Sequence, residues 1–114
     1  MIKHVVCFKL NDGESPEKAK EVLLSMKGNV PMLKGIEVGV DKLHSARSYD
    51  VILVVILEDM KALEDYQQDK YHVEVVKKHM HAVTKSSVAI DLVFNPLYRV
   101  LLQLRLFTSL LCLS

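Results

Sequence analysis

The sequence predicts one α+β domain in which four antiparallel strands and two helical regions follow in the order βαββαβ. The prediction rests on the apolar periodicity, which switches between two and about 3.6 residues along the first 94 positions. It also rests on size and composition, because 114 residues suit a single core and half of them are hydrophobic. The four glycines and three prolines are too few for a disordered or low-complexity chain.

Strands are predicted where apolar side chains alternate. In residues 2–10, every second side chain from Ile2 to Leu10 points to one face, His4 among them. Residues 51–57 are apolar on both faces, which is typical of a central strand in a covered sheet. Weaker alternation predicts further strands over residues 35–41 and 86–94.

Two helical regions are predicted between these strands. Ser15 is a candidate N-cap before Pro16, and apolar positions from Ala19 to Val30 predict a helix of about four turns. The second region opens at Glu58 and Asp59. Its expected buried stripe consists of Leu63, Tyr66, His72, Val75, Val76, His79 and Val83.

This order of elements is that of a ferredoxin-like sheet with both helices on one face. The other face would carry Val5, Cys7 and alternate members of residues 51–57, which are too apolar to face water. We therefore expect a homodimer that pairs these open faces and so forms a dimeric α/β barrel.

The chain divides into a domain at residues 1–95 and a Leu-rich extension at residues 96–114 of unknown role. Residues 97–114 contain eight leucines and no acid. Arg99, Gln103 and Arg105 argue against a membrane-spanning helix. The open alternatives are a strand or segment that covers a hydrophobic edge or extends an oligomer contact, and a membrane-surface element, which is the less expected.

Composition and motifs exclude several functional classes. A net charge of +1 argues against a general nucleic-acid binder. Cys7 and Cys112 cannot form a disulfide framework, and no secretory signal is visible, so we expect a cytoplasmic location. The common nucleotide-binding, zinc-protease and hydrolase motifs do not occur.

The candidate site residues are His72, His4 and Tyr66. His72 could act as a general base on a ligand held between helix and sheet. His4 lies on the apolar face of its strand, and the Tyr66 hydroxyl could orient a carbonyl oxygen. The alternatives are a hydrogen-bonded core histidine for His4 and His72, and for Tyr66 a core aromatic whose tip reaches water, which is the interpretation we favour.

No metal or cofactor is expected. His72 and His79 would lie about 10.5 Å apart along a helix, too far to share one ion. His79 and His81 point in opposite directions on a helix and chelate poorly. Asp91 could be a ligand but is more simply exposed or paired, and His44 is expected to be solvated.

The first 94 residues resemble the stress-responsive dimeric α/β barrel (Dabb) domain family. The matching positions are Ile2 to Leu10, Pro31, Gly35 and Ile36, Tyr49 and Asp50, Leu63, Tyr66, His72 and Val73, and Asp91. The resemblance implies a ferredoxin-like subunit that dimerises sheet to sheet, and most members of the family have no assigned reaction.

The resemblance extends to a plant member of the family, olivetolic acid cyclase, which closes a linear polyketide by aldol condensation. It implies that His72 is catalytic, with His4 and Tyr66 in supporting roles. This chain has Met26 where the cyclase has a second pocket tyrosine, and Asp69-Lys70 where the family often has His-Pro.

The sequence thus predicts a stress-response-type Dabb protein that binds or transforms a small hydrophobic carbonyl compound. Two alternatives stay open. One is a cofactor-independent aldol enzyme of the polyketide-cyclase type. The other is a non-enzymatic assembly protein with structural histidines, whose pocket would be filled by Met26 and whose His4 would bond to the backbone.

Overall fold

The computed structural model describes residues 1–97 and Leu104, and it has the predicted order of strands and helices. Its four-stranded sheet has the order β2-β3-β1-β4, with every neighbouring pair antiparallel. The elements are β1 (Ile2–Leu10), α1 (Pro16–Leu24), β2 (Gly35–Val40), β3 (Val51–Leu57), α2 (Met60–Gln68), η1 (His72–Lys77), α3 (Lys78–Val83) and β4 (Thr84–Val93).

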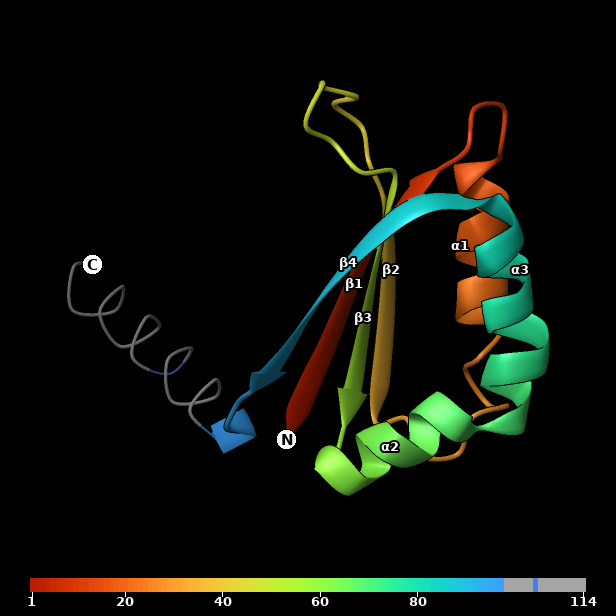
Figure 1. Cartoon of the computed structure of the whole chain (residues 1–114). Coiled ribbons are helices and arrows are strands. Elements are labelled where there is room, and N and C mark those ends of the chain that lie inside the picture. The colour runs from red at the N-terminus through yellow and green to blue at the C-terminus, as the bar shows by residue number, and fades with distance from the viewer. Residues whose placement is uncertain (98–103, 105–114) are drawn as a thin grey trace, which may run out of the picture.

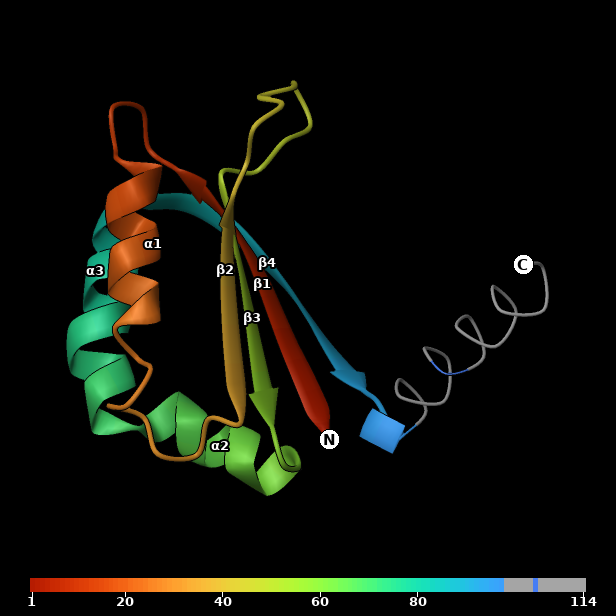
Figure 2. The same ribbon diagram turned by 180° about the vertical axis from the view of Figure 1, so that it is seen from behind.

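Figures 1 and 2 show α1 and α3 side by side against one face of the sheet, with α2 across one end of it. The hydrophobic core lies between these helices and the sheet. Its β3 side chains are Val51, Leu53, Val55 and Leu57, every second residue of a strand that is apolar throughout. Leu23 and Met26 come from the first helical region, and Val76 and Met80 from η1 and α3. The predicted ferredoxin-like α+β fold is therefore confirmed.

The first helix is shorter than predicted. The Ser15 hydroxyl accepts a hydrogen bond from the Lys18 backbone N–H, as expected of an N-cap, and Pro16 begins the helix. The helix ends at Leu24 rather than continuing to Val30, so the expected four turns are wrong. A series of turns follows, in which Gly28 adopts a φ of 84°, a conformation that glycine reaches without steric cost. Met26 and Val30 are buried from these turns rather than from a helix.

The second helical region contains a π-helix, η1, between α2 and α3. Along η1 and the following α3, the buried side chains are His72, Val76 and Met80, which are four residues apart. Val75, which the sequence placed on the buried stripe, is 43% exposed. The predicted stripe was therefore wrong at Val75 and missed Met80, because it assumed regular α-helical phase through this segment.

The open face of the sheet is apolar, as predicted. Strand register places Val5 opposite Ile90 and Cys7 between Ile52 and Val88. Ile90 is 62% exposed, the value expected of a residue outside the core. A Cβ atom on Gly39 would lie only 3.1 Å from the Ile52 side chain, so this glycine lets the isoleucine lie over β2.

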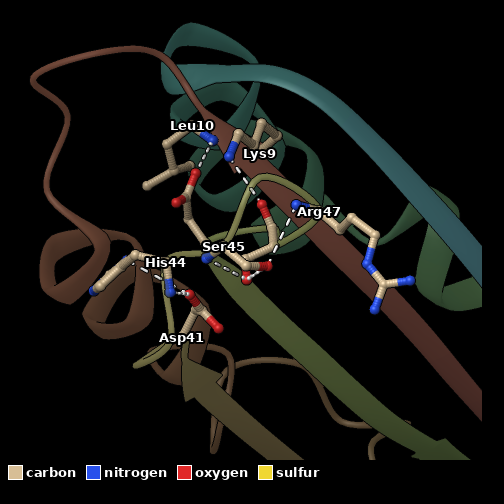
Figure 3. A network of polar contacts seen from close by, with 8 residues as sticks. Lys9, Leu10, Asp41, His44, Ser45 and Arg47 are labelled. Carbon is tan, nitrogen blue, oxygen red and sulfur yellow. Dashed lines mark hydrogen bonds and ion pairs between the residues drawn. The ribbon is translucent and has the colours of Figure 1, made fainter.

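The loop between β2 and β3 is tied to the end of β1 by polar contacts (Figure 3). The Leu10 backbone N–H donates to the Asp50 carboxylate at 2.7 Å, and Lys9 Nζ donates to the Ser48 carbonyl at 2.8 Å. Further along the loop, the His44 backbone N–H donates to the Asp41 carboxylate. His44 is exposed, as predicted, and carries no role in the core.

The predictions for the Leu-rich extension fall on residues that, apart from Pro96, Leu97 and Leu104, lie outside those described. Within the described residues, no helix has the length and apolar character needed to cross a membrane.

Candidate functional site

The structure brings the three predicted site residues into one cluster. The rings of Tyr66 and His72 are stacked, with centroids 4.1 Å apart and planes 21° apart. The His4 ring meets Tyr66 edge to face at a centroid distance of 5.7 Å. Tyr66 therefore lies between the two histidines, which come from β1 and from the first residue of η1.

The end of α2 fixes the tautomer of His72. The Tyr66 carbonyl lies in the last turn of α2, where it accepts the Asp69 backbone N–H at 3.2 Å and also the His72 Nδ1–H at 2.9 Å. The Asp69 carboxylate accepts the His72 backbone N–H at 3.0 Å and so holds the start of η1. Because a carbonyl can only accept, Nδ1 carries the proton and the neutral ring has its lone pair on Nε2.

The environment of His72 favours this neutral form. Burial lowers the pKa of His72 below its usual 6.5, and the nearby Lys77 charge lowers it further. The hydrogen bond to the Tyr66 carbonyl and the charge of Asp69 act in the opposite direction, but burial is the largest effect. At neutral pH His72 is thus an unprotonated base.

His4 is held by a carboxylate rather than by the backbone. β1 pairs with β4 so that His4 lies directly opposite Asp91, and His4 Nδ1 is 2.5 Å from Asp91 Oδ1. The His4 ring is buried, whereas the Asp91 side chain is partly exposed. The prediction that Asp91 is exposed or paired is confirmed. The backbone bond expected of a purely structural His4 is not the one that forms.

The favoured interpretation of Tyr66, an aromatic whose tip reaches water, is wrong. Tyr66 is fully buried, and its hydroxyl donates to the Met26 sulfur at 3.7 Å. Burial raises the pKa of the Tyr66 hydroxyl, so it remains a proton donor. A thioether is a weak acceptor, so a ligand oxygen could replace Met26 as the partner of this hydroxyl.

A cavity of about 220 Å³ reaches both histidines. The walls of this cavity come from the strands β1, β3 and β4 and from the helical segments α1, α2, η1 and α3. They include His4, Phe8, Leu53, Tyr66, Val76 and Met80. The volume corresponds to about seven water molecules at 30 Å³ each, which suits a small molecule rather than a drug-sized one.

The remaining histidines divide between two environments. His81 lines the cavity, which the sequence did not predict, whereas His79 is not part of its wall. Lys77, Thr84 and Ser87 also line it and were missed. The sequence signal for Lys77 is its spacing of five residues from His72. This spacing places both residues on the same side only in a π-helix, so a regular α-helical period does not predict it. Within the described residues, no group of three or more histidine, cysteine or acidic side chains is placed to hold a metal ion.

The lowered pKa of His72 predicts a pH dependence of stability. The unfolded chain takes up the proton near pH 6.5, before the folded chain does. The contribution of His72 to the free energy of unfolding is therefore complete above about pH 6.5 and is lost as the pH falls toward the lower folded-state pKa. Urea unfolding between pH 7.5 and 5 should show a steeper loss for the wild type than for His72→Gln, by at most about 1.4 kcal/mol per pH unit. Parallel profiles would contradict this.

Solved structures with the same fold cover most of the chain. A dimeric ferredoxin-like protein of unknown function from Thermobifida fusca shares 23% identity at a TM-score of 0.68, over 82% of this chain and 90% of its own. A Dabb family protein from Mesorhizobium loti shares 21% identity at 0.63, over 82% and 96%. A hydroxynitrile lyase from Passiflora edulis shares 14% identity at 0.66, over 83% and 94%.

No functionally curated protein matches the sequence. The model of the stress-responsive A/B barrel domain (Dabb) family matches residues 2–94, which span the whole sheet and all the helices packed on it. The chain therefore belongs to the stress-responsive A/B barrel domain family.

Proposed function

We propose that this protein binds a small hydrophobic carbonyl compound in the cavity and that His72 removes a proton from the carbon next to the carbonyl. The observation that carries this proposal is the hydrogen bond from His72 Nδ1 to the Tyr66 carbonyl. This hydrogen bond leaves His72 neutral with the lone pair on Nε2, and His72 lines the cavity. General-base catalysis needs a base of this kind, positioned and unprotonated at the working pH.

The step itself is a proton transfer. The Nε2 lone pair of His72 forms a bond to the proton as the C–H bond next to the carbonyl breaks, the C–H electron pair forms a C=C bond, and the carbonyl π pair moves onto the oxygen to give an enolate. A hydrogen-bond donor near that oxygen lowers the barrier. Tyr66 is the donor we assign, because burial keeps its hydroxyl protonated and its partner Met26 holds it weakly.

His4 has a positioning role in this proposal. The Asp91 carboxylate accepts from His4 Nδ1, so it fixes the orientation of the ring and leaves Nε2 as the nitrogen available to a ligand. The enolate would then lie among Tyr66, His72 and His4. The chemistry of such a proton transfer requires no cofactor.

The competing class is a non-enzymatic assembly protein with structural histidines. Its expected signatures are a pocket filled by Met26 and a His4 bonded to the backbone. Met26 does contact Tyr66, but a cavity remains whose wall includes Tyr66 and not Met26, and His4 is paired with Asp91. These observations favour the ligand-binding function. The Passiflora edulis structure, described as a hydroxynitrile lyase, supports only the statement that a chain of this fold can be an enzyme.

We also propose that the working form is a homodimer formed through the open sheet face. The support is the apolar character of that face and the description of solved structures of this fold as dimeric. A cytoplasmic location and a part in stress response belong to the same proposal.

Deuterium exchange tests the proposed proton transfer without knowledge of the natural substrate. The protein is incubated in D₂O with 5-oxohexanamide, a small neutral ketone, and deuterium at the carbons next to the ketone is followed by NMR. We expect exchange faster than in buffer containing the same concentration of free imidazole. Equal rates in the two samples would contradict the proposal.

A further inference from the structure

The cavity has two chemically different ends. His4, which is paired with Asp91, lies at one of them, where β1 pairs with the last part of β4. Four residues further along β1, about 13 Å at the usual strand rise, Phe8 pairs with Ser87. Thr84, which begins β4, lies beyond Ser87 and opposite Leu10. Both Ser87 and Thr84 line the cavity, so this second end is polar.

Lys77 brings a positive charge to the wall of the cavity. It is partly buried, and the ion pairs that form among the described residues do not include it. Lys77 lines the cavity together with His72, and its charge contributes to the lowered pKa of His72. A partly buried cation without an acidic partner is costly unless something anionic pairs with it.

Among the described residues no ion pair joins Lys77 to an acid: Glu74, three residues before it, is exposed, and Asp91 and Asp69 have other partners. Asp91 is paired with His4, and Asp69 accepts the backbone N–H of His72. The polar end also holds a hydroxyl without a partner. Among the buried side-chain oxygen and nitrogen atoms that the structure describes, Thr84 Oγ1 has no hydrogen bond. His81 adds a further nitrogen to the cavity wall.

We propose that the ligand is a keto acid, whose carbonyl faces His72 and whose carboxylate pairs with Lys77 near Thr84. This deepens the proposed function and rests on it. Lys77 follows His72 by five residues of η1, at most about 7.5 Å along the axis at the α-helical rise, which is compatible with a carbonyl and a carboxylate separated by a few carbon atoms. A charge-assisted hydrogen bond to the carboxylate is stronger than a neutral one, so the anion is the preferred ligand.

Two probes of nearly equal size test this assignment. They are 5-oxohexanoate and 5-oxohexanamide, which differ in one charge and have the same number of non-hydrogen atoms. Each is titrated into the full-length wild type, Lys77→Met and Lys78→Met, with the His72 ring signals followed by NMR. Lys78 is the matched control, because it is the adjacent lysine but is exposed and does not line the cavity.

The wild type and Lys78→Met should bind the acid about tenfold or more tightly than the amide. Lys77→Met should lose this preference and keep its affinity for the amide, which also shows that the variant is folded. Equal affinity for the two probes in the wild type, or an unchanged preference in Lys77→Met, would overturn the keto-acid assignment and leave the proposed function intact. If neither probe shifts the His72 signals, both proposals fail.

Discussion

Replacing His72 with alanine will lower the rate of deuterium exchange into 5-oxohexanamide by about 10² to 10⁴-fold, the usual effect of removing a general base. The variant lacks the atom to which we assign proton abstraction, His72 Nε2, which is left unprotonated by the hydrogen bond from Nδ1 to the Tyr66 carbonyl. Exchange is measured by NMR at pH 7, where the lowered pKa keeps His72 neutral.

The matched control for this variant is His79→Ala, because His79 lies one helical segment away and is not part of the cavity wall. It should exchange at the wild-type rate. His4→Ala should also lose exchange, since Asp91 then has no ring to position. Sedimentation should show that all three variants keep the oligomeric state of the wild type. A His72→Ala variant that is folded and exchanges at the wild-type rate would rule out the proton transfer.

Ile90→Lys will convert the proposed homodimer into a monomer. Ile90 lies opposite Val5 on the open face and is 62% exposed in a single chain. In the proposed dimer its side chain would be buried, and a lysine there would be a charge without a partner. We expect the dimer Kd to rise at least 100-fold, about 2.7 kcal/mol, in sedimentation measured over a range of concentrations.

Val73→Lys is the control for the open face. Val73 is similarly apolar and is 41% exposed, but it belongs to η1, which packs on the opposite side of the sheet from Ile90. It should dimerise like the wild type. A wild type that stays monomeric at all concentrations, or an Ile90→Lys variant that dimerises normally, would show that the open face has another use.

The strands and the open face could be predicted because their pattern is local. A side chain in a strand alternates between two faces whatever the strand pairs with, so residues 2–10 separate into a buried and an open set without further information. His4 falls in the buried set and Val5 in the open set for this reason alone. Residues 51–57 were identified as a central strand by another local signal, their apolar character on both faces.

The partner of His4 could not be predicted in this way. Asp91 is 87 residues away along the chain, and the pair depends on the register between β1 and β4. Alternation limits which side chains share a face, but a shift in register would bring a different residue opposite His4. The sequence therefore indicated that Asp91 could be paired without indicating its partner.

The helical segments were predicted less well because their hydrogen-bonding pattern changes. Val75 was expected inside and Met80 was not, since η1 departs from the 3.6-residue period. The contact of the Tyr66 hydroxyl with Met26 depends on two segments meeting in the core, 40 residues apart. Lys77 was missed for both reasons: it lies in the π-helix, and its importance comes from the cavity it faces.

β1 is a wall shared by two compartments. The side chains of even-numbered residues such as His4 line the cavity, while those of odd-numbered residues such as Val5 would contact the second subunit. A shift of the neighbouring subunit against the open face of β1 would displace the His4 ring on the other face, because only the strand backbone separates them. Dimer formation and proton transfer would then be hard to change independently. A substitution in β1 that alters the packing of the dimer face would also move the backbone that carries the cavity residues.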